Sequence, residues 1–237
     1  MKRYVKMISW ILLSVLLVSF CACQSGINHG KTDVCIKINN EPLDNNYIGY
    51  FFYIAKVSMI SEAGYTDSNS SDEDIKTYWE TNEIDGVNAV EVARDIAADN
   101  AVFQKVQYQK AVEEGVTLSD EELSVVKSDI ADVVGNNGGA KEFEKLLNER
   151  GTNMEAYEQI LIENFYISKL YELYDSKGLL DITNDELIAF SDARSPEIAP
   201  ENILDTAKME KFNSLAKQWE KNADIFIDDE AMKQFEV

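Results

Sequence analysis

The spacing of apolar residues changes along the chain and marks out its elements. Residues 34–38 read VCIKI, an alternation of apolar with polar or small residues that is typical of a short strand, and the turn-forming sequence NNEP follows. Asp44 or Asn45 can cap a helix, and after them apolar residues such as Tyr47 and Phe51 recur at helical spacing. The pattern therefore predicts a strand, a turn and a helix that ends near Gly64.

An acidic and serine-rich segment, DSNSSDEDIKTYWETNEIDG, comes next, and its pattern predicts an exposed connection of low regularity. Its start resembles a calcium-binding loop in the placing of Asp67, Asn69 and Ser71. However, Asp72 stands where such a loop requires Gly, and Tyr78 stands where it requires Glu. We interpret the segment as a solvated acidic loop and expect no metal site in it.

A long helix is predicted from Asn88 to Glu114, where neither Pro nor Gly interrupts the sequence and Gly115 follows. One face of it is small and apolar, namely Ala89, Ala93, Ile96, Ala97, Val102, Val106 and Ala111. Three residue pairs with the spacing of a capping box then predict helix starts: Ser119 with Glu122, Thr152 with Glu155, and Thr183 with Glu186.

The sequence GNNGG at 135–139 is interpreted as a helix end and turn, because it lacks the Gly-Lys-Ser/Thr ending of a phosphate-binding loop. A short helix is expected over 140–149 and a long, aromatic-rich one over Met154 to Asp175. After the proline-containing break SDARSPEIAPEN, a last helix is predicted from Asn202 to Lys221, followed by a strand in DIFID. We predict that this strand pairs with the one at 34–38.

The chain thus belongs to the mainly α class, with a small two-stranded β element that joins the N- and C-terminal ends of the mature chain. Residues 1–22 are predicted to be a signal peptide, 23–33 a lipidated tether, and 34–237 a single helical domain. Its C-terminal helix and strand, 202–228, are expected to return to the start of that domain.

The signal peptide ends in LLVSFCACQSG, after a basic start and the mostly apolar stretch from Met7 to Phe20. This ending resembles a bacterial lipobox, in which a small residue precedes a Cys that is lipidated on its sulfur. Ala22 precedes Cys23 and fits that rule, so Cys23 is the predicted lipidation site. Acylation by more than one chain would give lasting membrane attachment. An uncleaved or simply cleaved signal is the alternative.

Charge restricts the partners. The whole chain has 22 basic and 43 acidic residues, and the signal peptide holds three of the basic ones. The mature chain therefore has a formal net charge of −24, with 19 basic and 43 acidic residues. Such a chain is repelled by phosphate backbones, so we expect no nucleic-acid partner.

Few residues suggest chemistry. Cys35 is expected to be a small strand residue, and His29, the single histidine, lies in the tether. The many Asp and Glu residues show no spacing that assigns an acid or a base, and they are interpreted as solvated helix faces. We predict no catalytic residue, no metal ligand and no cofactor.

Three stretches carry a family resemblance: VCIKINNEPLDNNYIGYFF, QYQKAVEEGVTLSDEELS, and FEKLLNERGTNMEAYEQILIENFYISKLYE. In this order they resemble the N-terminal, substrate-holding domain of the SurA/PrsA family of extracytoplasmic foldases. The resemblance covers about 34–190, and KNADIFID is similar to the family's returning C-terminal segment. WETNEIDG is similar to lipoprotein members from clostridia and their relatives. The resemblance implies a SurA-N-like helical fold on the extracytoplasmic face of a Gram-positive cell membrane.

The chain departs from that family in one respect. Relatives often insert a parvulin-type prolyl isomerase domain, but here ITNDELIAFSDA runs directly into the proline-containing break. A domain of about 100 residues has no room there, and no histidine follows His29. The resemblance therefore implies a chaperone without its own isomerase domain, although family membership alone would suggest a peptidyl-prolyl isomerase.

The leading hypothesis is a membrane-anchored chaperone-like lipoprotein that binds unfolded or exported polypeptides. A dedicated module for one envelope partner and a peptidyl-prolyl isomerase are the alternatives. A holding protein needs exposed apolar surface for its clients. Aromatic and Met residues in excess of one buried stripe are the candidates for client binding, although for any single one of them a role in the core is the favoured interpretation: Tyr50, Phe51, Phe52, Tyr53, Met59, Phe165, Tyr166, Tyr171 and Tyr174.

Overall fold

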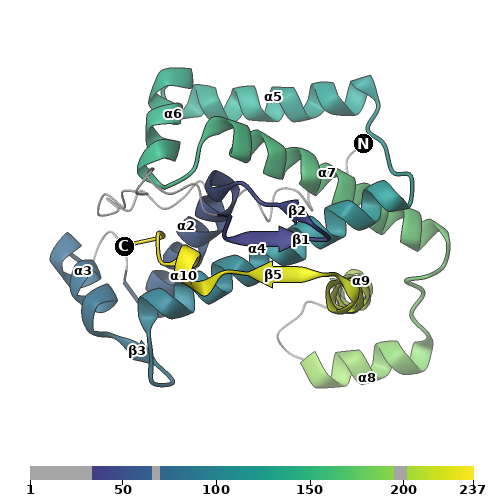
Figure 1. Cartoon of the computed structure of the whole chain (residues 1–237). Helices are drawn as coiled ribbons and strands as arrows, with labels where there is room; N and C mark the ends of the chain where they lie inside the picture. Colours follow the sequence, from purple (N-terminus) through teal and green to yellow (C-terminus); the bar gives the residue numbers. More distant parts are fainter. Residues whose placement is uncertain (1–33, 66–69, 195–201) are drawn as a thin grey trace.

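The computed structural model describes residues 34–65, 70–194 and 202–237, and its elements are shown in Figure 1. Over these ranges the chain is mainly helical, as predicted, with nine helices and five short strands. No helix in the described ranges is both long enough and apolar enough to cross a membrane. The predicted lipidation site, Cys23, lies outside the described residues, as do His29 and Asp67.

The two ends of the described chain meet in a small sheet. Strands β1 (Ile36–Ile38), β2 (Glu41–Pro42) and β5 (Ile225–Ile227) are antiparallel and lie in the order β2-β1-β5. The predicted pairing of the terminal strands is confirmed. The sheet has a third strand because Asn39 and Asn40, with φ of 50° and 67°, fold β2 back onto β1.

Helices α2 (Asn45–Glu62) and α4 (Ala89–Glu113) form the centre of the larger core. The predicted small face of α4 is confirmed, since Ala89, Ala93, Ala97 and Ala101 are fully buried. Their small side chains allow close packing, and α2 is buried on most of its circumference.

The acidic segment was expected to have low regularity, but its described residues, from 70 onwards, form regular elements, so that expectation is wrong for them. Helix α3 (Asp72–Thr81) starts at a capping box of Ser71 and Asp74. Strands β3 (Glu83–Ile84) and β4 (Val87–Asn88) then form a hairpin. Its turn is Asp85-Gly86, both with positive φ, which is the turn chemistry that two-residue hairpins require.

Helices α5 (Asp120–Asn136), α6 (Ala140–Glu149) and α7 (Met154–Ser176) follow the predicted positions. The capping box of Ser119 and Glu122 is confirmed, and so is that of Thr183 and Glu186. The box of Thr152 and Glu155 is wrong. Asn153 caps α7 by accepting a bond from the Ala156 amide.

This difference can be tested by comparing Asn153→Ala with Glu155→Ala. Loss of the Asn153 cap leaves an amide at the start of α7 without its partner, and we expect it to lower the free energy of unfolding by about 1 kcal/mol. Glu155 is exposed and is not part of a capping box, so its replacement should change that free energy by no more than about 0.5 kcal/mol. Urea denaturation measures both, and a larger loss for Glu155→Ala would contradict the assignment.

The C-terminal part consists of α8 (Asn184–Arg194), α9 (Ile203–Asn222), β5 and the short α10 (Asp229–Met232). A second, smaller apolar cluster lies where α9 meets the end of α7, with Phe212 and Tyr174 among its buried members. Trp219 packs against both clusters and so connects the larger core to the smaller one.

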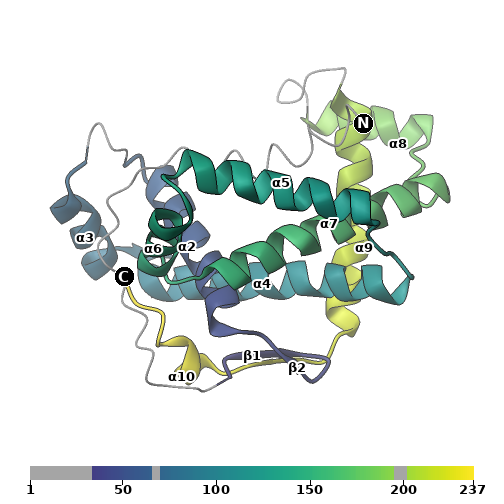
Figure 2. The ribbon, with the colours of Figure 1, turned by 90° about the horizontal axis from the view of Figure 1, so that it is seen from above.

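Figures 1 and 2 show how these elements are arranged around α4. The β2-β1-β5 sheet lies on one side of α4, and α7 with α5 outside it lies on the other side (Figure 2). Helix α8 lies at an edge of the molecule and packs mainly on α9.

Candidate functional site

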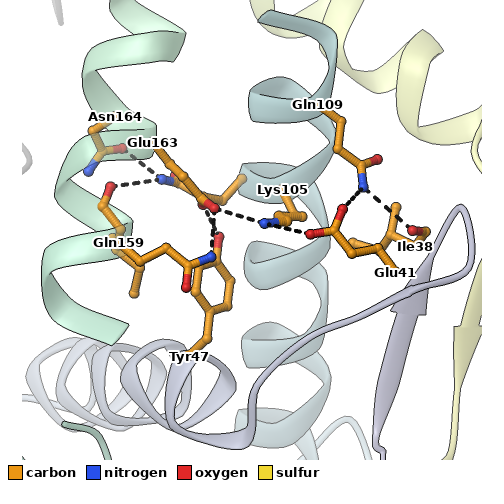
Figure 3. A network of polar contacts seen from close by, with 10 residues as sticks. Ile38, Glu41, Tyr47, Lys105, Gln109, Gln159, Glu163 and Asn164 are labelled. Atoms are coloured by element: carbon orange, nitrogen blue, oxygen red, sulfur yellow. Dashed lines mark hydrogen bonds and ion pairs between the residues drawn. The ribbon is translucent and has the colours of Figure 1, made fainter. Parts of the chain in front are cut away.

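A buried polar network lies between α4, α7, α2 and the β1–β2 turn (Figure 3). At its centre is Glu163 of α7, whose side chain is 1% exposed. One of its oxygens, Oε2, accepts a bond of 2.6 Å from the Tyr47 hydroxyl. The other, Oε1, accepts bonds of 3.0 Å each from Lys105 Nζ and from Gln159 Nε2. A buried carboxylate with three donors is well solvated by the protein itself.

Lys105 connects this carboxylate to Glu41 of strand β2. Its Nζ lies 3.0 Å from Glu163 Oε1 and 3.3 Å from Glu41 Oε1, and it lies over the ring of Tyr108 at 4.9 Å from the centroid. Figure 3 shows the lysine between the two carboxylates. The ammonium therefore has partners on all sides, one of which, Glu41, is half exposed to solvent.

The network continues into the sheet. Gln109 Nε2 donates to Glu41 Oε2 at 3.0 Å, and Gln109 Oε1 accepts a bond of 2.9 Å from Asn39 Nδ2. Asn39 in turn exchanges bonds with the Asp224 backbone just before β5. Polar contacts thus run from α7 through α4 to both ends of the described chain.

Burial and the neighbouring carboxylates favour the neutral hydroxyl of Tyr47 and the charged ammonium of Lys105. Burial raises the pKa of the Tyr47 hydroxyl well above its ordinary value, and Glu163 raises it further, so Tyr47 remains a donor. Burial by itself would lower the pKa of Lys105, but Glu163 and Glu41 outweigh it, and the pKa is raised. Tyr47, Lys105 and Gln159 each donate to Glu163. Through Lys105 and Glu41, the network joins β2 to α4 and α7.

The structure places most of the aromatic residues selected from the sequence in the core. Six of the nine candidates for client binding are buried, namely Tyr50, Phe51, Phe52, Tyr53, Met59 and Tyr174. They fill the space around α2 and the end of α7, so they cannot line an exposed groove in this conformation. Phe165, Tyr166 and Tyr171 are partly buried.

The partly buried candidates also have packing partners. Tyr171 contacts Phe212 with ring centroids 5.4 Å apart, and Tyr166 contacts Tyr108 at 5.2 Å. Burial, together with Asp175 and Asp205, raises the pKa of Tyr171 to about 12. These contacts show that Tyr166 and Tyr171 pack where α7 meets α4 and α9, and do not line an open surface.

Of the eight large apolar side chains that are exposed in the described ranges, three lie on the turn after α7, on α8 and at the start of α9. Ile188 is 60% exposed, and Leu179 and Leu204 are each more than two-fifths exposed. None of the described α8 side chains is fully buried. We call these three residues the α8 corner. Sequence reasoning missed it because Leu179, Ile188 and Leu204 lie in three separate segments, and nothing in their spacing marks them as exposed.

No group of three or more His, Cys, Asp or Glu side chains within the described ranges is arranged to hold a metal ion. Cys35 is buried beside β1, where Gln234 Nε2 lies 2.7 Å from its sulfur. Its position fits the expected packing role.

In the part of the chain that the structure describes, these observations define a mainly helical protein in which strands β1 and β5 pair and a polar network is centred on the buried Glu163. Comparison with protein-family models, with curated proteins and with solved structures found no match to this chain. Its function therefore has to be argued from its own residues.

Proposed function

We propose that this chain is a membrane-anchored, chaperone-like lipoprotein that binds unfolded or exported polypeptides on the extracytoplasmic face of a bacterial membrane. It would do so without catalysis. The resemblance of the stretch ending at Cys23 to a lipobox and the order of the SurA/PrsA-like motifs support this proposal. The parvulin domain of such foldases has no counterpart in the sequence, so we do not propose isomerase activity.

The observation that carries the proposal is the α8 corner. Ile188, Leu179 and Leu204 are exposed on elements that follow one another along the chain at an edge of the molecule (Figure 1). Where exposed apolar side chains form a contiguous patch, they mark a site for a partner. An unfolded polypeptide presents apolar side chains that such a corner could cover.

The net charge supports the same function. An acidic surface keeps a complex with an aggregation-prone client in solution, because like-charged complexes repel one another. The formal net charge of −21 for the whole chain provides that repulsion.

The test uses the full chain in lipid nanodiscs, mixed with a chemically unfolded client while light scattering follows client aggregation. We expect suppression at near-stoichiometric ratios. The double variant Ile188→Asp/Leu204→Asp should require a several-fold higher concentration for the same suppression, because charge at the α8 corner disfavours apolar contacts.

Val125→Asp provides a matched control, since Val125 is 51% exposed on α5, away from the α8 corner. It should suppress aggregation as well as the unchanged chain does. Absence of suppression by the folded, unchanged chain would contradict general client binding and favour a dedicated partner. Equal loss in both variants would contradict the assignment of the α8 corner.

A further inference from the structure

The β2-β1-β5 sheet ends in β5, and one edge of that strand has no strand beside it within the described ranges. Figure 1 shows β5 as the outermost strand of the sheet. Strand edges of this kind present backbone donors and acceptors to any extended chain that approaches them.

The register shows which backbone groups face outward. Cys35 O accepts a bond from the Asp228 amide, and the Asn39 amide donates to Asp224 O. In an antiparallel ladder, residues alternate between facing the partner strand and facing away. With Lys37 opposite Phe226, the backbone groups of Phe226 face β1, while those of Ile225 and Ile227 point away from it.

The side chains at this edge do not discourage pairing. β5 reads Ile-Phe-Ile, without the Pro or Lys that commonly blunts a strand edge. Phe226 is 49% exposed on the outer face of the sheet, where Lys37 of β1 lies over its ring. An added strand would place a side chain directly beside Phe226.

Acidic residues surround this edge and indicate the charge of its partner. Asp224 precedes β5, and Asp228 and Asp229 follow it. On α4, burial raises the pKa of the Asp95 carboxyl, and the carboxylates of Asp99 and Asp229 raise it further. Of the basic groups nearby, Lys37 lies one strand inward and Lys233 is paired with Glu230 at 2.7 Å.

This charge also selects against a second copy of the chain. Two copies joined edge to edge would bring Asp224 and Asp228 of each copy towards those of the other, with like net charges. A basic polypeptide would instead be attracted by these carboxylates, and the attraction would orient it along the strand.

We propose that the outer edge of β5 binds an extended segment of a basic and apolar polypeptide as an additional strand, through the backbone groups of Ile225 and Ile227. This inference rests on the proposed function, because it names the class of client segment that the protein holds. In this proposal the α8 corner binds apolar side chains of the client, whereas the β5 edge binds the client's backbone through hydrogen bonds.

The test measures binding of a fluorescently labelled peptide of alternating lysine and valine to the full chain in nanodiscs, by anisotropy. Ile227→Pro removes the outward N–H at an edge position that tolerates proline. We expect the dissociation constant to rise by about tenfold or more. Ile227→Val, which keeps the N–H, should leave it within about twofold.

Three results would overturn the proposal. Unchanged binding by Ile227→Pro would exclude the backbone at 227, and an equal loss in Ile227→Val would assign binding to the side chain. Slow hydrogen exchange of the Ile225 and Ile227 amides in the absence of peptide would show that another strand already occupies the edge. If the exchange rate depends on protein concentration, that strand comes from a second copy of the chain. If it does not, the strand comes from residues 1–33. A peptide with glutamate in place of lysine should bind far more weakly.

The aggregation assay separates this proposal from the proposed function. If the unchanged chain and Ile227→Pro suppress aggregation equally while peptide binding is lost only in the variant, the edge is real but is not a site of client holding. If the unchanged chain suppresses aggregation but does not bind the peptide, the edge proposal fails and the holding function stands.

Discussion

Replacing Lys105 with methionine is expected to lower the free energy of unfolding by about 3–5 kcal/mol, the cost of leaving a buried charge without its partner. Glu163 is 1% exposed, and after the replacement it would keep its carboxylate among Tyr47 and Gln159 without the ammonium at 3.0 Å. Urea denaturation followed by circular dichroism measures the change. A variant that fails to fold at 25 °C would be the extreme of the same effect.

Two further variants test whether the loss comes from the buried charge of Lys105 or from its packing. Lys76→Met removes an exposed lysine whose ion pair with Glu80 spans 3.8 Å, and it should change the free energy of unfolding by about 0.5 kcal/mol or less. Lys105→Met combined with Glu163→Leu and Tyr47→Phe replaces the buried polar centre by apolar groups of similar volume, and it should recover most of the loss. No recovery would mean that Lys105 acts through packing and not through charge.

The element order was predictable because helix ends are written in local sequence. Helix starts were expected at Asp44 or Asn45, at Asn88 and at Ser119, and the structure shows Asp44, Asn88 and Ser119 as caps. The errors have local causes as well. The capping box at the start of α3 has Asp74 where the usual pattern has Glu or Gln, so it was not recognised. The Asp85-Gly86 turn was not recognised because the whole segment was interpreted from its acidic composition.

The polar network was not predicted, although a signal for it exists. Lys105 continues the four-residue row of buried alanines on α4 that runs through Ala97 and Ala101. Glu163 stands between Ile160 and Leu170 on the buried side of α7. A lone charge on a buried helix face needs a partner, and here the two lie on different helices. Sequence spacing within one helix cannot pair them.

The excess of aromatic residues was misleading because α2 is buried on most of its circumference. A helix at the centre of a core needs apolar side chains on every side, so Tyr50, Phe52 and Tyr53 are not surplus. Arg150 lies over the ring of Tyr53, at 4.7 Å from its centroid, and Phe52 contacts Phe235 at 5.8 Å. The exposed apolar residues of the α8 corner are aliphatic instead.

Truncating Phe235 to alanine is the second change for which we expect a large effect, a loss of about 3–5 kcal/mol in the free energy of unfolding. Phe235 is 1% exposed, its ring contacts Phe52 of α2, and its carbonyl accepts a 2.9 Å bond from Arg94 Nε. The last residues of the chain therefore belong to the larger core, and a cavity there removes contacts that no neighbour can replace.

Phe226→Ala is the matched control, because Phe226 is also an aromatic of the C-terminal segment but is half exposed on β5. Its truncation should change the free energy of unfolding by about 0.5 kcal/mol or less. Denaturation by urea measures both variants, and similar small losses would show that the C-terminal segment is not held in the core. A large loss for Phe235→Ala alone would mean that the packed tail contributes to stability. That tail is joined to β5 through α10 and Asp228, and the Asp228 amide donates to Cys35 O beside β1. The packed tail would then fix β5 against β1. The β5 edge would then be a rigid surface, already arranged for an incoming strand.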